Sequence, residues 1–152
     1  MSISEKSSSL EQQRAEEKIF MLVEKELNIT LEKNPTLYLS NNKYTYIKPD
    51  FYSAEHHIIG EIFAHIGKPK KAQDNKIAND ILKMLLLEKL AGESYRKIIV
   101  VCDKNEEKKL KGLSALSESI RQFKIEILYI EIDDELRSEI LNAQERQKKT
   151  NV

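Results

Sequence analysis

The chain has 152 residues, 40% of them apolar and 33% charged, which is the size and composition of one polar, foldable domain and excludes a disordered chain. The charges of its 25 basic and 25 acidic residues cancel. Proteins that bind nucleic acid are usually basic overall, so this balance argues against such a protein but allows a local basic patch. No apolar run approaches the ~20 residues of a membrane span, and the Ser-rich start offers no apolar stretch for a signal peptide. Together with a single cysteine, Cys102, these features predict a cytoplasmic protein that contacts no membrane.

The first half of the chain predicts one helix and then three strands. Residues 1–8 are polar and Ser-rich, and we expect them to be disordered. A helix is predicted over residues 10–28, because apolar residues recur there at spacings of three and four. The three strands, rich in Tyr, Thr and Ile, are expected over residues 36–40, 43–52 and 57–67. A short turn joins the last two, so they should form an antiparallel hairpin.

The second half alternates helices and strands. We expect helices over residues 73–90, 105–123 and 134–147, and strands over residues 97–102 and 124–132. The unbroken apolar centre of residues 97–102 is typical of a strand buried on both faces. The order α-β-β-β-α-β-α-β-α predicts an α/β fold with a mixed five-stranded sheet flanked by helices. We expect these elements to form one domain over residues 9–147, followed by a polar tail at residues 148–152.

Two acids, Asp50 and Glu61, lie on the two arms of the predicted hairpin. If the turn centres near Glu55-His56, they come out opposite each other, with Cβ atoms about 4.5–5.5 Å apart. Carboxylates that close share either a proton or a cation. The alternative is a different register, in which both acids are solvated.

The sequence becomes basic after Glu61, with the lysines Lys68, Lys70, Lys71 and Lys76. Gln73 and Lys76 share one face at the start of the predicted helix, whose N-terminus also favours anions. Carboxylates for a metal and lysines for a phosphate would together form a phosphodiester site. The alternative is a solvated loop, with Lys76 paired to Asp80 one helical turn later.

The order of elements, with Pro49-Asp50 ending one strand and Glu61 inside the next, resembles the PD-(D/E)XK nuclease superfamily, which includes restriction endonucleases and Holliday-junction resolvases. Residues 59–68, followed by Gln73, Lys76 and residues 81–84, more specifically resemble a group of small bacterial proteins of that superfamily. The resemblance runs over about residues 10–147 and implies a restriction-endonuclease-like core.

The resemblance implies a nuclease that hydrolyses phosphodiester bonds of nucleic acid, with DNA as the expected partner. Asp50 and Glu61 would ligate Mg²⁺ or Mn²⁺, and an acid of the first helix, Glu17 or Glu24, would lie near the metal. Water would attack the phosphate in line, with the metal offsetting charge on the phosphoryl oxygens. The expected nucleic-acid contacts are Lys68, Lys70, Lys71 and His65.

One position departs from the superfamily pattern, which places a lysine two residues after the glutamate. Here that residue is Phe63, which can neither orient water nor offset charge. Either the lysine has migrated to the next helix, where Lys76 is supported by Gln73, or the site is inactive and the fold serves as a module that binds nucleic acid or protein. A nucleotide-binding domain is a third reading, but the chain has no phosphate-binding loop. A double-strand cutter of this size would need to be a homodimer.

Overall fold

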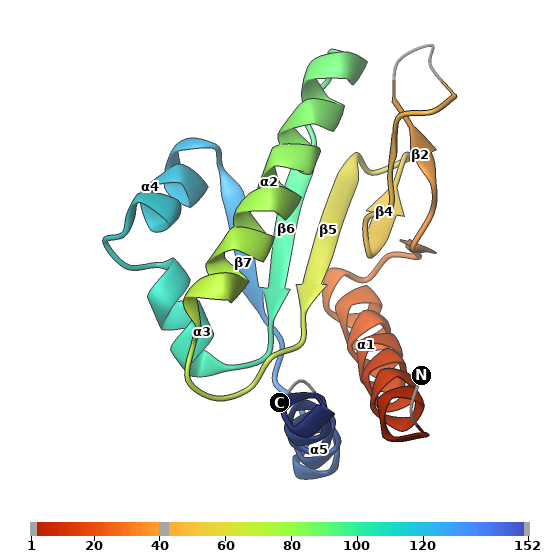
Figure 1. Ribbon diagram of the computed structural model, residues 1–152. Helices are drawn as coiled ribbons and strands as arrows, with labels where there is room; N and C mark the ends of the chain where they lie inside the picture. The colour runs from red at the N-terminus through yellow and green to blue at the C-terminus, as the bar shows by residue number, and fades with distance from the viewer. Residues whose placement is uncertain (1–2, 40–42, 151–152) are drawn as a thin grey trace.

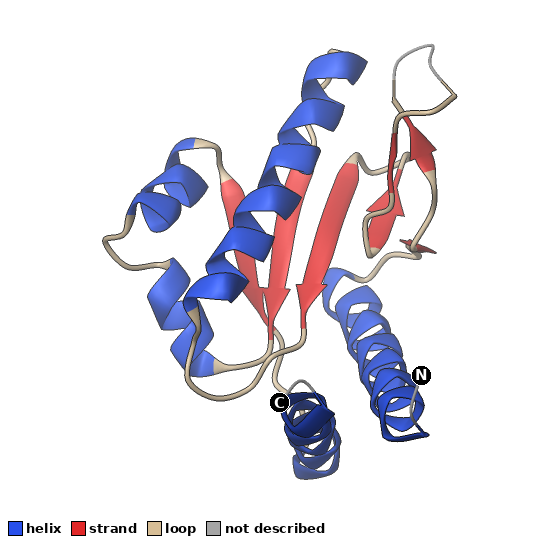
Figure 2. Ribbon diagram, viewed as in Figure 1, coloured by secondary structure: helices blue, strands red, loops and turns tan. Residues whose placement is uncertain are grey.

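The computed structural model describes residues 3–39 and 43–150 and has an α/β fold with a mixed five-stranded sheet at its centre (Figures 1 and 2). In spatial order the sheet consists of β1 (Glu32–Lys33), β4 (Phe51–Ser53), β5 (Ile58–Phe63), β6 (Arg96–Val101) and β7 (Ile125–Tyr129). The pairs β1–β4 and β4–β5 are antiparallel, and the pairs β5–β6 and β6–β7 are parallel. The predicted α/β class and mixed five-stranded sheet are confirmed.

Helices cover the two faces of the sheet and bury a hydrophobic core on each (Figure 1). The first core lies under α1 (Ile3–Leu27) and α5 (Asp134–Thr150), and the second lies under α2 (Lys71–Ala91), α3 (Lys104–Leu110) and α4 (Ala115–Gln122). Within the described ranges, no helix is long and apolar enough to cross a membrane.

Side chains alternate between the two cores along the central strands. In β5, Ile58 and Ile62 face the first core, whereas Ile59 and Phe63 face the second. Every residue from Lys97 to Val101 is buried in β6, which confirms a strand covered on both faces. Glu61 lies between Ile62 and Gly60 in β5 and therefore shares the side of Phe63, the side of α2.

The predicted strand over residues 43–52 is wrong at residues 43–45, where the chain turns, and at residues 48–50. Pro49 has no backbone N–H to give to a ladder, and the chain leaves the strand there. The residues before it form β3 (Tyr46–Ile47), which pairs with β2 (Leu37–Tyr38) in a separate two-stranded sheet. The predicted strand over residues 36–40 therefore lies outside the main sheet, with Ser40 beyond the described residues, and the short polar β1 takes the edge position instead.

Several element ends also differ from the prediction. The predicted helix over residues 105–123 is two helices, because Ser114 begins α4 by accepting a hydrogen bond from the backbone N–H of Ser117 at 3.1 Å. The helix α1 starts at Ile3, within the segment expected to be disordered, and α5 runs past the predicted end to Thr150. The strand β5 ends at Phe63 because the backbone N–H groups of Ile66 and Gly67 bond to side chains of Gln144 and Asp103 instead of a ladder.

Gly60 lies directly under the ring of Phe51 where β4 and β5 pair. A Cβ atom at Gly60 would come within 1.9 Å of Phe51 Cζ, so glycine is the residue that this close approach requires. Phe51 is fully buried, and its ring leaves no space for a side chain on the neighbouring strand.

We expect Gly60→Ala to lower the free energy of unfolding by about 1–3 kcal/mol, the usual cost of overpacking a tight core. Urea unfolding followed by circular dichroism measures this loss. The double variant Phe51→Leu/Gly60→Ala should be less destabilised than the sum of the two single variants, because leucine frees the space that alanine needs. If the losses of unfolding free energy of the two single variants simply add in the double variant, the Phe51 ring is not the reason that residue 60 must be glycine.

Candidate functional site

Asp50 and Glu61 lie opposite each other across the β4–β5 hairpin, as the sequence predicts. The register pairs Phe51 with Gly60, and its continuation by one residue pairs Asp50 with Glu61. The Asp50 carboxylate accepts a hydrogen bond from the backbone N–H of Ile62 at 2.7 Å and is also hydrogen-bonded to the Glu61 side chain. Its carbonyl oxygen accepts from the backbone N–H of Asn34 at 2.9 Å. Asp50 is therefore fixed through both its main chain and its side chain.

Glu61 is a carboxyl group that resists ionisation. Burial, the negative charge of Asp50 and the hydrogen bond to Asp50 hold the pKa of Glu61 far above its usual range. Asp80 raises this pKa further, and Lys76 opposes the rise. Without a cation, the pair of carboxyl groups therefore retains a proton at neutral pH.

Two more carboxylates flank the pair, one from each neighbouring helix. Glu16 of α1 and Asp80 of α2 both have a raised pKa, chiefly because they are partly buried and also because Asp50 is negative. Lys76 lowers the pKa of both. Asp50 therefore acts electrostatically on Glu16, Glu61 and Asp80, and Lys76 opposes its effect on all three.

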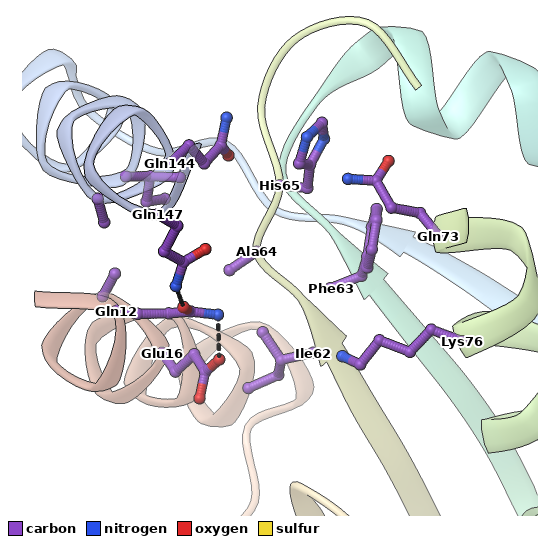
Figure 3. Close-up of a pocket in the computed structure, with 13 residues that line it drawn as sticks. Gln12, Glu16, Ile62, Phe63, Ala64, His65, Gln73, Lys76, Gln144 and Gln147 are labelled. Atoms are coloured by element: carbon purple, nitrogen blue, oxygen red, sulfur yellow. Dashed lines mark hydrogen bonds between the residues drawn. The ribbon is translucent and has the colours of Figure 1, made fainter. Parts of the chain in front are cut away.

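Lys76 reaches these acids from α2 along the ring of Phe63. Its Nζ lies 5.9 Å from the centroid of that ring, within the range of a cation–π contact. Figure 3 shows the side chain extending past Phe63 toward Ile62. The amine beside the Phe63 ring therefore comes from α2, the helix that follows β5.

Gln73 and His65 lie beside Lys76 at the edge of a pocket of about 230 Å³ (Figure 3). The carbonyl oxygen of the Gln73 side chain accepts from the backbone N–H of Lys70 at 3.0 Å, which fixes the first turn of α2. The His65 ring stacks against Phe63 with centroids 5.8 Å apart, and its Nδ1 is buried without a hydrogen-bond partner. Burial and the nearby Lys70 lower the pKa of His65, so the imidazole is neutral at pH 7.

The acids expected from the first helix take other roles. Glu17 is exposed and forms an ion pair with Lys33 at 2.9 Å, and Glu24 accepts a hydrogen bond from the backbone N–H of Leu31. The residue that interacts with Asp50 is Glu16, which we did not single out. Glu16 precedes the buried Phe20 by one helical turn, and this spacing was the signal available in the sequence.

The lysines of the basic segment lie apart from the carboxylates. Lys68 and Lys70 line a second hollow together with His65 and Lys148 of α5, whereas Lys71 is exposed at the first residue of α2. The pocket of about 230 Å³ is also lined by glutamines of α1 and α5, namely Gln12, Gln144 and Gln147.

The Asp50–Glu61 pair fits a hard divalent cation. Among the residues that the structure describes, no three His, Cys, Asp or Glu side chains converge as a ready-made metal site. Mg²⁺ does not require one, because it usually keeps several waters and binds through one or two carboxylates and a substrate phosphate. A proton retained between two carboxyl groups also marks a place where a cation would be more favourable.

The chain matches no protein-family model, no curated protein and no solved structure. What the site can do therefore follows from the residues that form it. It combines paired carboxylates, a single amine and a small polar pocket, a set that suits a substrate with a phosphate group.

We expect Glu61→Gln to flatten the dependence of stability on pH in metal-free protein. The folded state keeps a proton that the unfolded chain releases above the ordinary pKa of 4.5, so wild-type stability falls as pH rises from there. The fall can reach about 1.4 kcal/mol per pH unit, the limit for one proton. Glutamine removes the titrating group, so the variant should become the more stable protein toward about pH 8.

Urea unfolding across this pH range, with metal removed by a chelator, measures the difference. The matched control is Glu17→Gln, which neutralises an exposed acid of α1 and should follow wild type. Parallel curves for wild type and Glu61→Gln would show that Glu61 is ionised in the folded protein.

Proposed function

We propose that the protein is a nuclease with a restriction-endonuclease-like core, which hydrolyses phosphodiester bonds of nucleic acid with Mg²⁺ or Mn²⁺. The proposal depends chiefly on the Asp50–Glu61 pair, whose half-buried carboxyl groups face each other beside Lys76. It is supported by the succession of an antiparallel β1–β4–β5 unit, the helix α2 and the parallel strand β6, which agrees with the element order of that superfamily.

Each residue of the site has a distinct part in this proposal. Asp50 and Glu61 hold the divalent cation, which supplies the positive charge that offsets the phosphoryl oxygens. Lys76 adds a second positive charge from α2 and orients the attacking water or the phosphate. The Phe63 ring supports the lysine, and Gln73 stabilises the first turn of the helix that carries it.

Lysines at the rim provide contacts for the nucleic-acid backbone. Lys68, Lys70 and Lys148 lie around one hollow beside His65 with a single acid, Glu145, so the hollow is positive on balance although the chain as a whole is neutral. DNA is the proposed substrate, and cutting both strands of a duplex would require a second copy of the chain.

One observation favours a different function. Phe63 stands where the superfamily has its lysine, and an inactive nuclease-fold module that binds nucleic acid or protein would show the same replacement. The two functions differ in whether the site binds a divalent cation and cuts.

We expect cleavage of DNA that requires Mg²⁺ or Mn²⁺ and falls at least about 10²-fold in Asp50→Ala, Glu61→Ala and Lys76→Met, the usual loss for one group that stabilises transition-state charge. The assay compares plasmid, linear duplex, single-stranded DNA and RNA. The matched control is Lys89→Met, which removes an exposed lysine of the last turn of α2. No cleavage, together with no calorimetric binding of Mn²⁺, would favour the inactive module.

A double variant tests whether Lys76 takes the role of the lysine that the superfamily places on the strand. We expect Phe63→Lys to restore part of the activity of Lys76→Met, because the amine then returns to the Glu61 side of β5. A rescue of tenfold or more over Lys76→Met alone would correspond to about 1.4 kcal/mol of recovered transition-state stabilisation. If the double variant is inactive but remains folded by circular dichroism, Lys76 does not do the work of a lysine at position 63.

A further inference from the structure

A small polar pocket opens beside the carboxylates, between α1, α5 and the segment that joins β5 to α2 (Figure 3). Its volume is about 230 Å³, and its apolar wall consists of short or aliphatic side chains from three elements: Ala15, Ala64, Ile140 and Ala143. The remaining wall is formed by amides, an imidazole and an aromatic ring, together with Ile62, the Glu16 carboxylate and the Lys76 amine. The mechanism proposed above leaves most of these groups without a role.

A hydrogen-bonded chain of side chains orients the amides on one side of the pocket. Gln147 donates through Nε2 to Gln12 Oε1 at 2.5 Å, and Gln12 donates through Nε2 to the carboxylate of Glu16 at 3.5 Å. Because a carboxylate can only accept, this chain sets the direction of both amides. The carbonyl oxygen of Gln147 is thereby left as an acceptor on the side of Ala64 (Figure 3).

Donor and aromatic groups lie on the opposite side. The Gln73 carbonyl oxygen is bound by Lys70, so its amide nitrogen remains to donate, and it points toward His65 (Figure 3). The His65 ring is stacked on Phe63, and its buried Nδ1 has no hydrogen-bond partner. Two stacked rings, the Gln147 acceptor and the Gln73 donor therefore line one small space.

The pocket is continuous with the candidate catalytic site. Glu16 and Ile62 line both this pocket and the smaller hollow that contains Asp50. Lys76 lines the pocket as well and acts electrostatically on Glu61. A group bound in the pocket would therefore lie beside the place where a phosphate meets the carboxylates.

We propose that this pocket receives one unpaired nucleobase of the substrate, next to the phosphate that is cut. The inference rests on nucleic acid being the ligand of the proposed function. The volume is below the ~300–1,000 Å³ of pockets for drug-sized ligands, so it suits a single flat ring system. A base also stacks on aromatic rings and presents donors and acceptors along its edge.

The geometry excludes a paired base. The space lies between two helices and a loop, and its lining includes the buried residues Ala15, Ile140 and Ala143, so only a base removed from its stack can reach into it. The edge that pairs in a duplex is also the edge that the amides would contact. The substrate class that follows is a single strand, or a duplex with one unpaired nucleotide, in preference to intact duplex.

Binding measured without divalent cations tests the pocket separately from cleavage. The probe is a short fluorescein-labelled single strand of DNA, with an abasic residue placed at each position in turn. One abasic position should weaken binding roughly tenfold, as expected from the loss of one stacked base. Intact duplex and a duplex with one unpaired nucleotide form the other arms, and the unpaired nucleotide should strengthen binding.

Two variants locate the effect in the pocket. Gln147→Leu removes the acceptor at an exposed residue of α5, and Ala64→Leu fills part of the space while every amide of the pocket is kept. Both should bind the intact and the abasic strand equally. Asn142→Leu, at an exposed residue of the same helix outside the pocket, should keep the roughly tenfold difference.

The outcomes separate this inference from the proposed nuclease activity. Base-dependent binding that needs Gln147 supports the pocket even if no strand is cut, and the nuclease proposal alone would then fail. Cleavage that depends on Asp50 but is indifferent to the abasic position overturns the pocket and leaves the nuclease. If no nucleic acid binds or is cut, both are overturned.

Discussion

Two like charges placed directly opposite each other on neighbouring strands are destabilising, and the structure around Asp50 and Glu61 is arranged to tolerate them. The backbone N–H groups of Ile62 and Asn34 hold Asp50, and the Glu61 carboxyl keeps its proton. The helices on either side then add Glu16 and Asp80, and the nearby amines of Lys76, Lys33 and Lys83 only partly offset the rise in the pKa of these acids. A divalent cation removes the remaining repulsion more completely than any rearrangement of the side chains.

The hairpin that pairs Asp50 with Glu61 could be predicted from the sequence, because it depends on residues close together in the chain. A turn centred at Glu55-His56 and alternating side chains in β5 are enough to place Asp50 opposite Glu61. The strand β1 was missed for the opposite reason, since its two polar residues pair with β4 across a long stretch of chain and carry no apolar pattern. Pro49 was visible in the sequence, and the prediction of one continuous strand gave its missing N–H too little weight.

The glutamine-lined pocket could not be predicted, because it depends on how α1 and α5 pack. Neighbouring residues of a helix point about 100° apart, so choosing Glu17 over Glu16 was enough to miss the acid that faces Asp50. Gln12 and Gln147 meet only because these two helices lie together under the sheet, at opposite ends of the sequence. Polar residues carry little periodic signal of their own, and a contact between them becomes visible only in three dimensions.

The position of a lysine on a helix depends on the loop that leads into the helix. In this protein the loop between β5 and α2 is fixed by Gln144, Asp103 and Gly67. Gln144 of α5 donates to the carbonyl oxygen of Ile66 and accepts from its N–H, and Asp103 bonds the N–H of Gly67 while it also caps α3. Gly67 has φ +104°, a conformation that favours glycine, and it turns the chain toward α2. A strand lysine would have been positioned by the sheet alone. Here the position of Lys76 depends on α5, α3 and the glycine together, so any movement of Gln144 would act on the same loop that holds the Lys76 amine beside Phe63.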